Sequence, residues 1–233
     1  SATSLGARPM LGSASSSTTD PDPSNNTDQA ATTASPRADL QATISAPASV
    51  NAGQTVNVSG TCTNNGPSPA AGASCVLGGL PPGATQSCTP IPVPDPLDVG
   101  STITCTASFV APASGSLNLT STAGSATADG VPANNTASTT TAITPQADMA
   151  AAVSGFAANP TAGSTATGAV SCTNNGPSTA ANATCAVTGL PAGVTVTCTP
   201  ATPVASLAVG STISCAVSYT VPASGSVAVT GTA

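Results

Sequence analysis

Cysteine and aspartate are the residue types in this chain that could do chemistry. The 233 residues include eight Cys and eight acidic residues, but no His, and Arg8 and Arg37 are the only basic residues. The commonest general base and metal ligand is therefore absent, and without Lys there is no Schiff-base or P-loop chemistry. Two Arg cannot form a phosphate-binding surface. We expect no enzyme, no catalytic residue, no cofactor and no nucleic-acid partner.

The eight cysteines predict four disulfides. Their number is even, no His is present to share a zinc site, and the chain is poor in charge. This pattern is typical of a protein folded in an oxidising compartment. A tetrathiolate zinc site is the alternative, and the absence of any Cys-x-x-Cys pair argues against it. We therefore expect no metal site among the cysteines.

The aspartates gather in part near the N-terminus, where oxygen donors alternate along the chain: Asp20, Asp22, Ser24, Asn26 and Asp28. Such alternation is found in calcium-binding loops. Two prolines within the run stiffen it, no Gly stands at the sixth position, and no Glu stands at the twelfth. The segment is better explained as a turn.

A tandem duplication is the strongest signal in the sequence. The segment Cys-Thr-Asn-Asn-Gly-Pro-Ser at 62–68 recurs at 172–178, and all the cysteines of the first copy recur 110 residues later. In order, the two sets are Cys62, Cys75, Cys88 and Cys105, then Cys172, Cys185, Cys198 and Cys215. The period is far longer than that of solenoid repeats. We place repeat 1 at 38–146 and repeat 2 at 147–233, after an N-terminal extension at 1–37.

Within each repeat the apolar residues recur with a period of two. Val56, Val58, Gly60 and Cys62 alternate with polar residues, and short runs of this kind are separated by Gly, Pro and Asn turns. No helical period appears, and Pro is too frequent for long helices. The pattern predicts an all-β fold of two tandem β-sandwiches. No apolar run is long enough to span a membrane.

The pairing of the cysteines is open to three arrangements in each repeat. All four cysteines share the parity of the core residues, so we expect them inside, near one pole. We favour Cys62–Cys105 with Cys75–Cys88, because the second pair is symmetric about the turn at 80–83. The sequential pairing, Cys62–Cys75 with Cys88–Cys105, remains an alternative. Each bridge is expected to contribute roughly 2–4 kcal/mol.

Several short blocks resemble a known family of bacterial surface proteins. They are Ala38-Asp-Leu40, Thr63-Asn-Asn-Gly-Pro-Ser68, Gly79-Leu-Pro-Pro-Gly83 and Asp20-Pro-Asp-Pro-Ser-Asn-Asn26. In order and spacing they are similar to the "conserved repeat domain", a domain of unknown function. The resemblance implies an immunoglobulin-like sandwich, secretion, and tandem arrays with structural or adhesive roles at the cell surface. It offers no catalytic residue, and the core cysteines depart from the family pattern.

The two ends of the chain do not match. Ala233 corresponds to Ala123, so repeat 2 has no copy of 124–144 and lacks the last strand of its sandwich. The segment 20–35 aligns with 129–144 at an offset of 109. We therefore predict a donor strand within about 20–35, formed by Asn25, Asn26, Thr27, Ala30, Ala31, Thr32, Thr33 and Ala34.

These ends suggest how the protein works. If the donor strand of one chain completes repeat 2 of a neighbour, identical subunits join head to tail into an extracellular filament. An alternative is a stalk or spacer segment of a large tandem-repeat adhesin, since an excerpt of an array would show the same mismatch. An enzyme accessory or carbohydrate-binding module is a third class, disfavoured by the lack of exposed aromatic residues.

Residues 1–11 match the segment 110–120 poorly, which suggests a true mature terminus. Leu5, Met10 and Leu11 are the only large apolar residues before Leu40. We expect them to anchor in a neighbour's groove. A flexible tail is the alternative.

Overall fold

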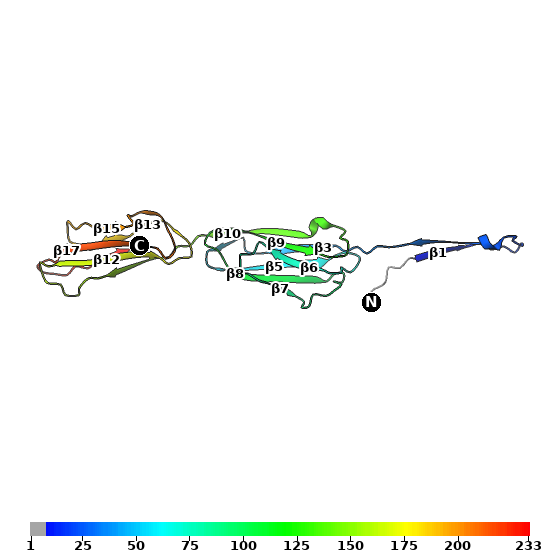
Figure 1. Cartoon of the computed structure of the whole chain (residues 1–233), viewed down its shortest axis with the longest axis horizontal. Coiled ribbons are helices and arrows are strands. Elements are labelled where there is room, and N and C mark those ends of the chain that lie inside the picture. The colour runs from blue at the N-terminus through cyan, green and yellow to red at the C-terminus, as the bar shows by residue number, and fades with distance from the viewer. Residues whose placement is uncertain (1–7) are drawn as a thin grey trace.

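The structure is a computed structural model and describes residues 8–233. It is all-β: two β-sandwiches follow one another along the long axis, and an extended hairpin projects from the N-terminal side of the first (Figure 1). Between residues 8 and 233, strands pair only within the hairpin, within repeat 1 or within repeat 2. Each repeat also has its own hydrophobic core. The expected all-β sandwich fold is confirmed.

The elements of the N-terminal hairpin are β1 (Arg8–Ser13), the 3-10 turn η1 (Pro23–Asn25) and β2 (Thr27–Thr32). Those of repeat 1 are β3 (Leu40–Ser45), β4 (Ser49–Asn51), β5 (Thr55–Asn64), β6 (Ser74–Gly78), β7 (Gln86–Thr89), β8 (Thr102–Val110), β9 (Gly115–Gly124), η2 (Pro132–Asn134) and β10 (Thr136–Thr144). Those of repeat 2 are β11 (Met149–Ser154), β12 (Thr165–Asn174), β13 (Ala180–Ala183), β14 (Ala186–Thr188), β15 (Thr197–Thr199), β16 (Val204–Leu207), β17 (Thr212–Thr220) and β18 (Thr230–Thr232).

Repeat 1 is a closed sandwich of two four-stranded sheets, β3-β5-β8-β7 and β4-β10-β9-β6. Alternate residues of β5 are buried, as its period of two predicts. The largest fully buried apolar side chains of repeat 1 are Leu40, Val56, Val58, Leu97, Ile103 and Leu119, all at most 2% exposed.

Repeat 2 keeps only one of these sheets intact. The sheet β11-β12-β17-β15 matches β3-β5-β8-β7 in order, whereas the facing layer consists of two separate pairs, β14-β18 and β13-β16. Within the described residues no strand of repeat 2 holds the place of β10. The counterpart of β4, at 159–161, is not a strand either. In repeat 1, β4 pairs only with β10, so a repeat without a β10 strand leaves the counterpart of β4 without a strand to pair with.

A buried asparagine fixes the turn at the N-terminal pole of each repeat. Asn64 is fully buried, and its amide nitrogen donates to the carbonyls of Ser68 and Leu97, both at 3.0 Å. Its Oδ1 accepts from the Gly66 amide at 3.1 Å. A Cβ on Gly66 would collide with the backbone of Ala38, so glycine is required where the turn meets the entering chain.

All eight cysteines form disulfides, but the pairing that we favoured is wrong. The bonds are sequential: Cys62–Cys75, Cys88–Cys105, Cys172–Cys185 and Cys198–Cys215. The turn at 80–83 does not join a hairpin, because β6 and β7 belong to different sheets. In repeat 1 the first bond links the two sheets, from β5 to β6, and in repeat 2 it links β12 to Cys185, just before β14.

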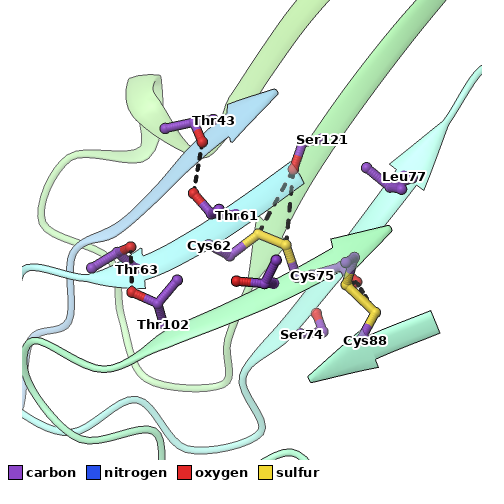
Figure 2. Close-up of a disulfide and its surroundings, with 12 residues drawn as sticks. Thr43, Thr61, Cys62, Thr63, Ser74, Cys75, Leu77, Cys88, Thr102 and Ser121 are labelled. Carbon is purple, nitrogen blue, oxygen red and sulfur yellow. Dashed lines mark hydrogen bonds between the residues drawn. A yellow bond between two sulfur atoms is a disulfide. The ribbon is translucent and has the colours of Figure 1, made fainter. Parts of the chain in front are cut away.

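Figure 2 shows the inter-sheet bond Cys62–Cys75 beside Ser121, whose hydroxyl lies 3.9 and 3.8 Å from the two sulfur atoms. Cys88 and Cys105 instead stand directly opposite one another on β7 and β8. Cys88 and its counterpart Cys198 are only half-buried, so the expectation that all the cysteines lie inside is wrong for these two.

The N-terminal hairpin corrects a further expectation. β1 pairs antiparallel with β2 from Arg8–Thr32 to Ser13–Thr27. In repeat 1, β9 pairs with β10 in the same register once residue numbers are shifted by 109. Residues 8–14 therefore do have a counterpart, 117–123. The sequence comparison missed it because only one residue of the segment, Ala14, is identical.

No helix among residues 8–233 is long and apolar enough to cross a membrane.

Candidate interaction site: the open edge of repeat 2

β10 closes the sandwich of repeat 1. It pairs with β9 along Thr136–Ile143 and, at its end, with β4. Thr141 is fully buried and its hydroxyl donates to the Pro47 carbonyl at 2.7 Å, while Ile143 is 6% exposed. The Ala52 amide donates to the Thr144 carbonyl at 2.9 Å. One strand thus supplies both a sheet partner and a core wall.

Repeat 2 has a hollow where this strand lies in repeat 1. The hollow has a volume of about 560 Å³. Its walls include Val153 of β11, Phe156, Tyr219 of β17, and Val227 and Val229 of the segment that enters β18. These correspond to the residues around β10 in repeat 1. The outer edge of β18 is unpaired in the described chain, and such an edge readily accepts another strand.

The exposure of equivalent residues on the first strand of each repeat shows the effect of having no counterpart of β10. Ala42 of β3 is 7% exposed, whereas Ala151, its counterpart on β11, is exposed. Val153 is 44% exposed, although its counterpart Ile44 packs against the core of repeat 1. The described residues also give Ala162, the counterpart of Ala52, no acceptor for its amide. In repeat 2, apolar side chains are therefore exposed and a backbone N–H donor is without an acceptor among the described residues.

The turn before β10 closes the N-terminal pole of repeat 1. Asp129 accepts from the Leu40 amide at 2.9 Å, and the amide nitrogen of Asn134 donates to the Asp39 carboxylate at 2.9 Å. Gly130 also donates to the Ala38 carbonyl at 2.7 Å. The corresponding residues of repeat 2, Ala147 and Asp148, are exposed, and Met149 is half-buried. Among the described residues, the N-terminal pole of repeat 2 therefore has no counterpart of the Asp129 carboxylate and the Asn134 side-chain amide.

The N-terminal hairpin carries the groups that repeat 2 lacks. Asp20 and Asn25 stand at the positions of Asp129 and Asn134. On β2 and the residues just after it, the face equivalent to the buried face of β10 is formed by Asp28, Ala30, Thr32 and Ala34. Thr32 is identical to Thr141, and Ala34 replaces Ile143. Phe156 already reaches into the hollow, so a smaller side chain at this position is compatible with it.

Asp28 is the one unfavourable member of this face. It stands where repeat 1 has the half-buried Ala137. Its cross-strand partner on β18 would be Gly231, the counterpart of Ser121, which pairs with Ala137. A Cβ on Gly231 would collide with the buried side chain of Val170, so this face of β18 points into the core and the Asp28 carboxylate would lie next to apolar side chains there.

The structure places the predicted donor residues as follows. Thr27, Ala30, Ala31 and Thr32 lie on β2, Asn25 ends η1, Asn26 follows it, and Thr33 and Ala34 lie just beyond the strand; all but the half-buried Asn26 are exposed. Of the predicted anchors, Met10 and Leu11 are 67% and 71% exposed on β1. Leu5 falls outside the described residues.

The alternating aspartates Asp20 and Asp22 accept hydrogen bonds from within their own turn. Asp20 accepts from the Asp22 amide at 2.9 Å, and Asp22 accepts from the amide of Ser24 at 3.2 Å and from its hydroxyl. In the part of the chain that the structure describes, no group of three metal-ligating His, Cys, Asp or Glu side chains is found.

Comparisons with known proteins give no family. No family model matches the chain, and no curated protein matches it. Domains 4 and 5 of the S-layer protein SbsC are 18% identical, with a TM-score of 0.26 over 52% of this chain and 60% of that one. The secreted serine protease VesC from Vibrio cholerae is 9% identical, with a TM-score of 0.29 over 81% and 48%.

A protein of unknown function from Porphyromonas gingivalis W83 is 12% identical, with a TM-score of 0.29 over 77% of this chain and 83% of that one. The chain thus spans about three fifths of the S-layer fragment and about half of the protease. Likenesses at this level carry no argument about function.

Proposed function

We propose that the protein is a structural subunit of an extracellular filament, in which β2 of one chain completes repeat 2 of the next. β2 enters the hollow between β11 and β18 and takes the place that β10 holds in repeat 1. The protein has no catalytic role in this account. Its partners are identical chains.

The observation that carries this proposal is the match of register between two hairpins. β1 and β2 pair as β9 and β10 do, with every residue number shifted by 109. A segment with the geometry and the inward residues of a closing strand therefore lies exposed in the same chain that has an unclosed sandwich. Strand addition of this kind gains affinity from main-chain hydrogen bonds and specificity from alternate side chains.

Insertion requires β2 to leave β1, because β18 already lies where β1 would lie. The exchange of β1 for β18 as the sheet partner of β2 favours insertion. All residues of β1 and β2 are exposed, and an isolated two-stranded hairpin is at best marginally stable in water. In repeat 2, β2 instead gains a sheet partner and an apolar wall. Burial of apolar surface there is worth roughly 25 cal/mol per Å².

The contact generates an open polymer. The donor lies before repeat 1 and the acceptor lies in repeat 2, so the two contact surfaces of each chain differ and lie at opposite ends. A heterologous contact that does not close produces a filament. The linear arrangement of the hairpin and the two repeats in Figure 1 suits such a chain of subunits.

The composition suits an extracellular location. Four disulfides are typical of proteins in oxidising environments. No Lys or Arg occurs between residues 38 and 233, so proteases that cleave after basic residues find no site in either repeat.

A stalk in a longer tandem array is the second candidate function. The observation that favours it is that 8–35 copies the whole β9–β10 hairpin, β1 included, rather than β10 alone. In an array, this hairpin would close a sandwich that precedes repeat 1 in the same polypeptide.

Electron microscopy and intact mass on the same native material separate the two functions. The filament account predicts polymers built from separate chains that are not joined covalently, and a chain lacking residues 1–36 forms none while repeat 1 stays folded. A much heavier covalent chain would establish the stalk. Dispersed monomers, or polymers that survive the deletion, would refute strand exchange.

A further inference from the structure

The joint between the two repeats is built from a turn on one side and a glycine on the other. Pro177 packs against Gly53, so that a Cβ on this glycine would lie 3.2 Å from Pro177 Cγ. The hydroxyl of Ser178 donates to the Ala113 carbonyl at 2.5 Å and accepts from the Gln146 amide at 2.9 Å. Ser178 is only 2% exposed as a result.

The N-terminal pole of repeat 1 carries the same turn without a partner among the described residues. Ser68 accepts from the Arg37 amide at 3.2 Å, as Ser178 does from Gln146. The hydroxyl of Ser68 finds no acceptor within residues 8–233, and the side chain is half-buried instead of buried. The turn itself is equally rigid, because Asn64 holds it as Asn174 holds its copy.

The far pole of repeat 2 carries the matching acceptor surface. Gly163 has a φ of +78°, as Gly53 has, but a Cβ on it would meet no atom within 4 Å. Its amide donates to the Val221 carbonyl at 2.9 Å, and the Gly53 amide donates to the Ala111 carbonyl at 3.1 Å. Ala223 and its counterpart Ala113 are both exposed, but only the Ala113 carbonyl accepts a side-chain hydrogen bond within the described residues. The backbone that receives the turn is thus already formed.

We propose that this pole of repeat 2 docks the N-terminal pole of repeat 1 of a second copy, with Pro67 on Gly163 and the Ser68 hydroxyl on the Ala223 carbonyl. The inference rests on the proposed function, because β2 in the hollow brings the two poles together. Ser35-Pro36-Arg37 then leads into repeat 1 as Thr144-Pro145-Gln146 leads into repeat 2. Every joint along the filament is therefore equivalent, within a chain or between chains.

Photo-crosslinking of the full chain tests this surface. A benzoylphenylalanine replaces Pro67 in one variant, Pro177 in a second and Ala31 in a third. All three positions are exposed. Light and heavy isotope forms are mixed before assembly, so that crosslinks between chains are recognised by mass. The Pro177 variant is the matched control and is expected to crosslink to 51–54 of its own chain.

The Pro67 variant is expected to crosslink to 161–164 of another chain. The Ala31 variant reports on strand exchange alone, since the outward face of β2 would lie beside 226–230 of the neighbour. Crosslinks from Ala31 between chains without any from Pro67 to 161–164 would overturn the joint and leave strand exchange intact. The absence of both, with the Pro177 control working, would overturn both proposals.

Discussion

Ile44 and Val153 hold the same position on the first strand of their repeats, yet Ile44 packs against a core while Val153 is 44% exposed. The strand that covers Ile44 is β10, and repeat 2 has no such strand among the described residues. The difference between two copies of one sandwich thus locates the surface on which we propose that β2 of another chain binds. The predictions below follow from that surface and from the bonds that hold each repeat.

A charge on the inward face of β2 should block assembly. Ala30 occupies the place of the half-buried Thr139, so Ala30→Asp buries a carboxylate against Val153 and Val229 and is expected to lower polymer formation by at least tenfold. Ala31→Asp makes the same change on the outward face, where Thr140 is exposed. Sedimentation of both variants checks this. Equal polymer yields from the two would contradict the proposed orientation of β2.

The tip of the hairpin should add affinity through Asp20. In repeat 1, Asp129 accepts from the Leu40 amide, and Asp20 would accept from the Met149 amide of the neighbour. A hydrogen bond to a charged group contributes roughly 1.5–3 kcal/mol, so Asp20→Ala is expected to weaken assembly at least tenfold in critical concentration.

Asp22→Ala is the matched control for this effect. Asp22 caps its own η1 and corresponds to Val131, which makes no such contact with repeat 1. The alanine is therefore expected to leave the critical concentration nearly unchanged. A larger loss for Asp22→Ala than for Asp20→Ala would show that the tip docks differently.

The buried asparagine should be intolerant of charge. Asn64→Asp replaces a donor to two carbonyls with an acceptor, and the expected loss in the free energy of unfolding of repeat 1 is roughly 3 kcal/mol. Burial raises the pKa of the introduced carboxyl in the folded state. Stability is then greatest below the pKa of the unfolded group and falls as pH rises through the folded pKa. Urea unfolding at several pH values checks the sign, and stability that rises with pH would contradict it.

The two repeats should unfold separately, with repeat 2 first. Among the described residues repeat 2 has no counterpart of β10, whereas its Cys172–Cys185 bond closes a loop of the same length as Cys62–Cys75 in repeat 1. Replacing Cys172 and Cys185 by alanine is expected to lower the first thermal transition, by roughly 2–4 kcal/mol in stability. The same change at Cys62 and Cys75 should lower the second. One cooperative transition for the whole chain would contradict this order.

Much of the fold could be predicted because it depends on local signals. The alternation along β5 and the repeated Asn-Gly-Pro turn are enough to indicate sandwiches and their duplication. The disulfide pairing could not be predicted, because it depends on which sheet β6 joins, and the turn at 80–83 looks the same in either case. The chain around Phe156 also differs from its counterpart in repeat 1, and only the structure shows the ring reaching into the hollow.

The candidate site was predicted in part. The similarity of 20–35 to 129–144 was visible in the sequence, but β1 was missed because strand pairing tolerates almost any residue at exposed positions. The joint at Pro177 and Gly53 was missed at the residue level because it depends on a contact between segments far apart in the chain. The only signal of this joint in the sequence is that the Asn-Gly-Pro-Ser turn and the glycine that receives it each occur in both repeats.

The central claim is that β2 of one chain occupies the hollow of repeat 2 in another. The most direct test adds a synthetic peptide of residues 20–36 to the full chain and follows amide hydrogen exchange. The account predicts slower exchange in 227–232 and shorter polymers, and neither effect from the same peptide with Ala30→Asp. Unchanged exchange in 227–232 at saturating peptide would contradict it.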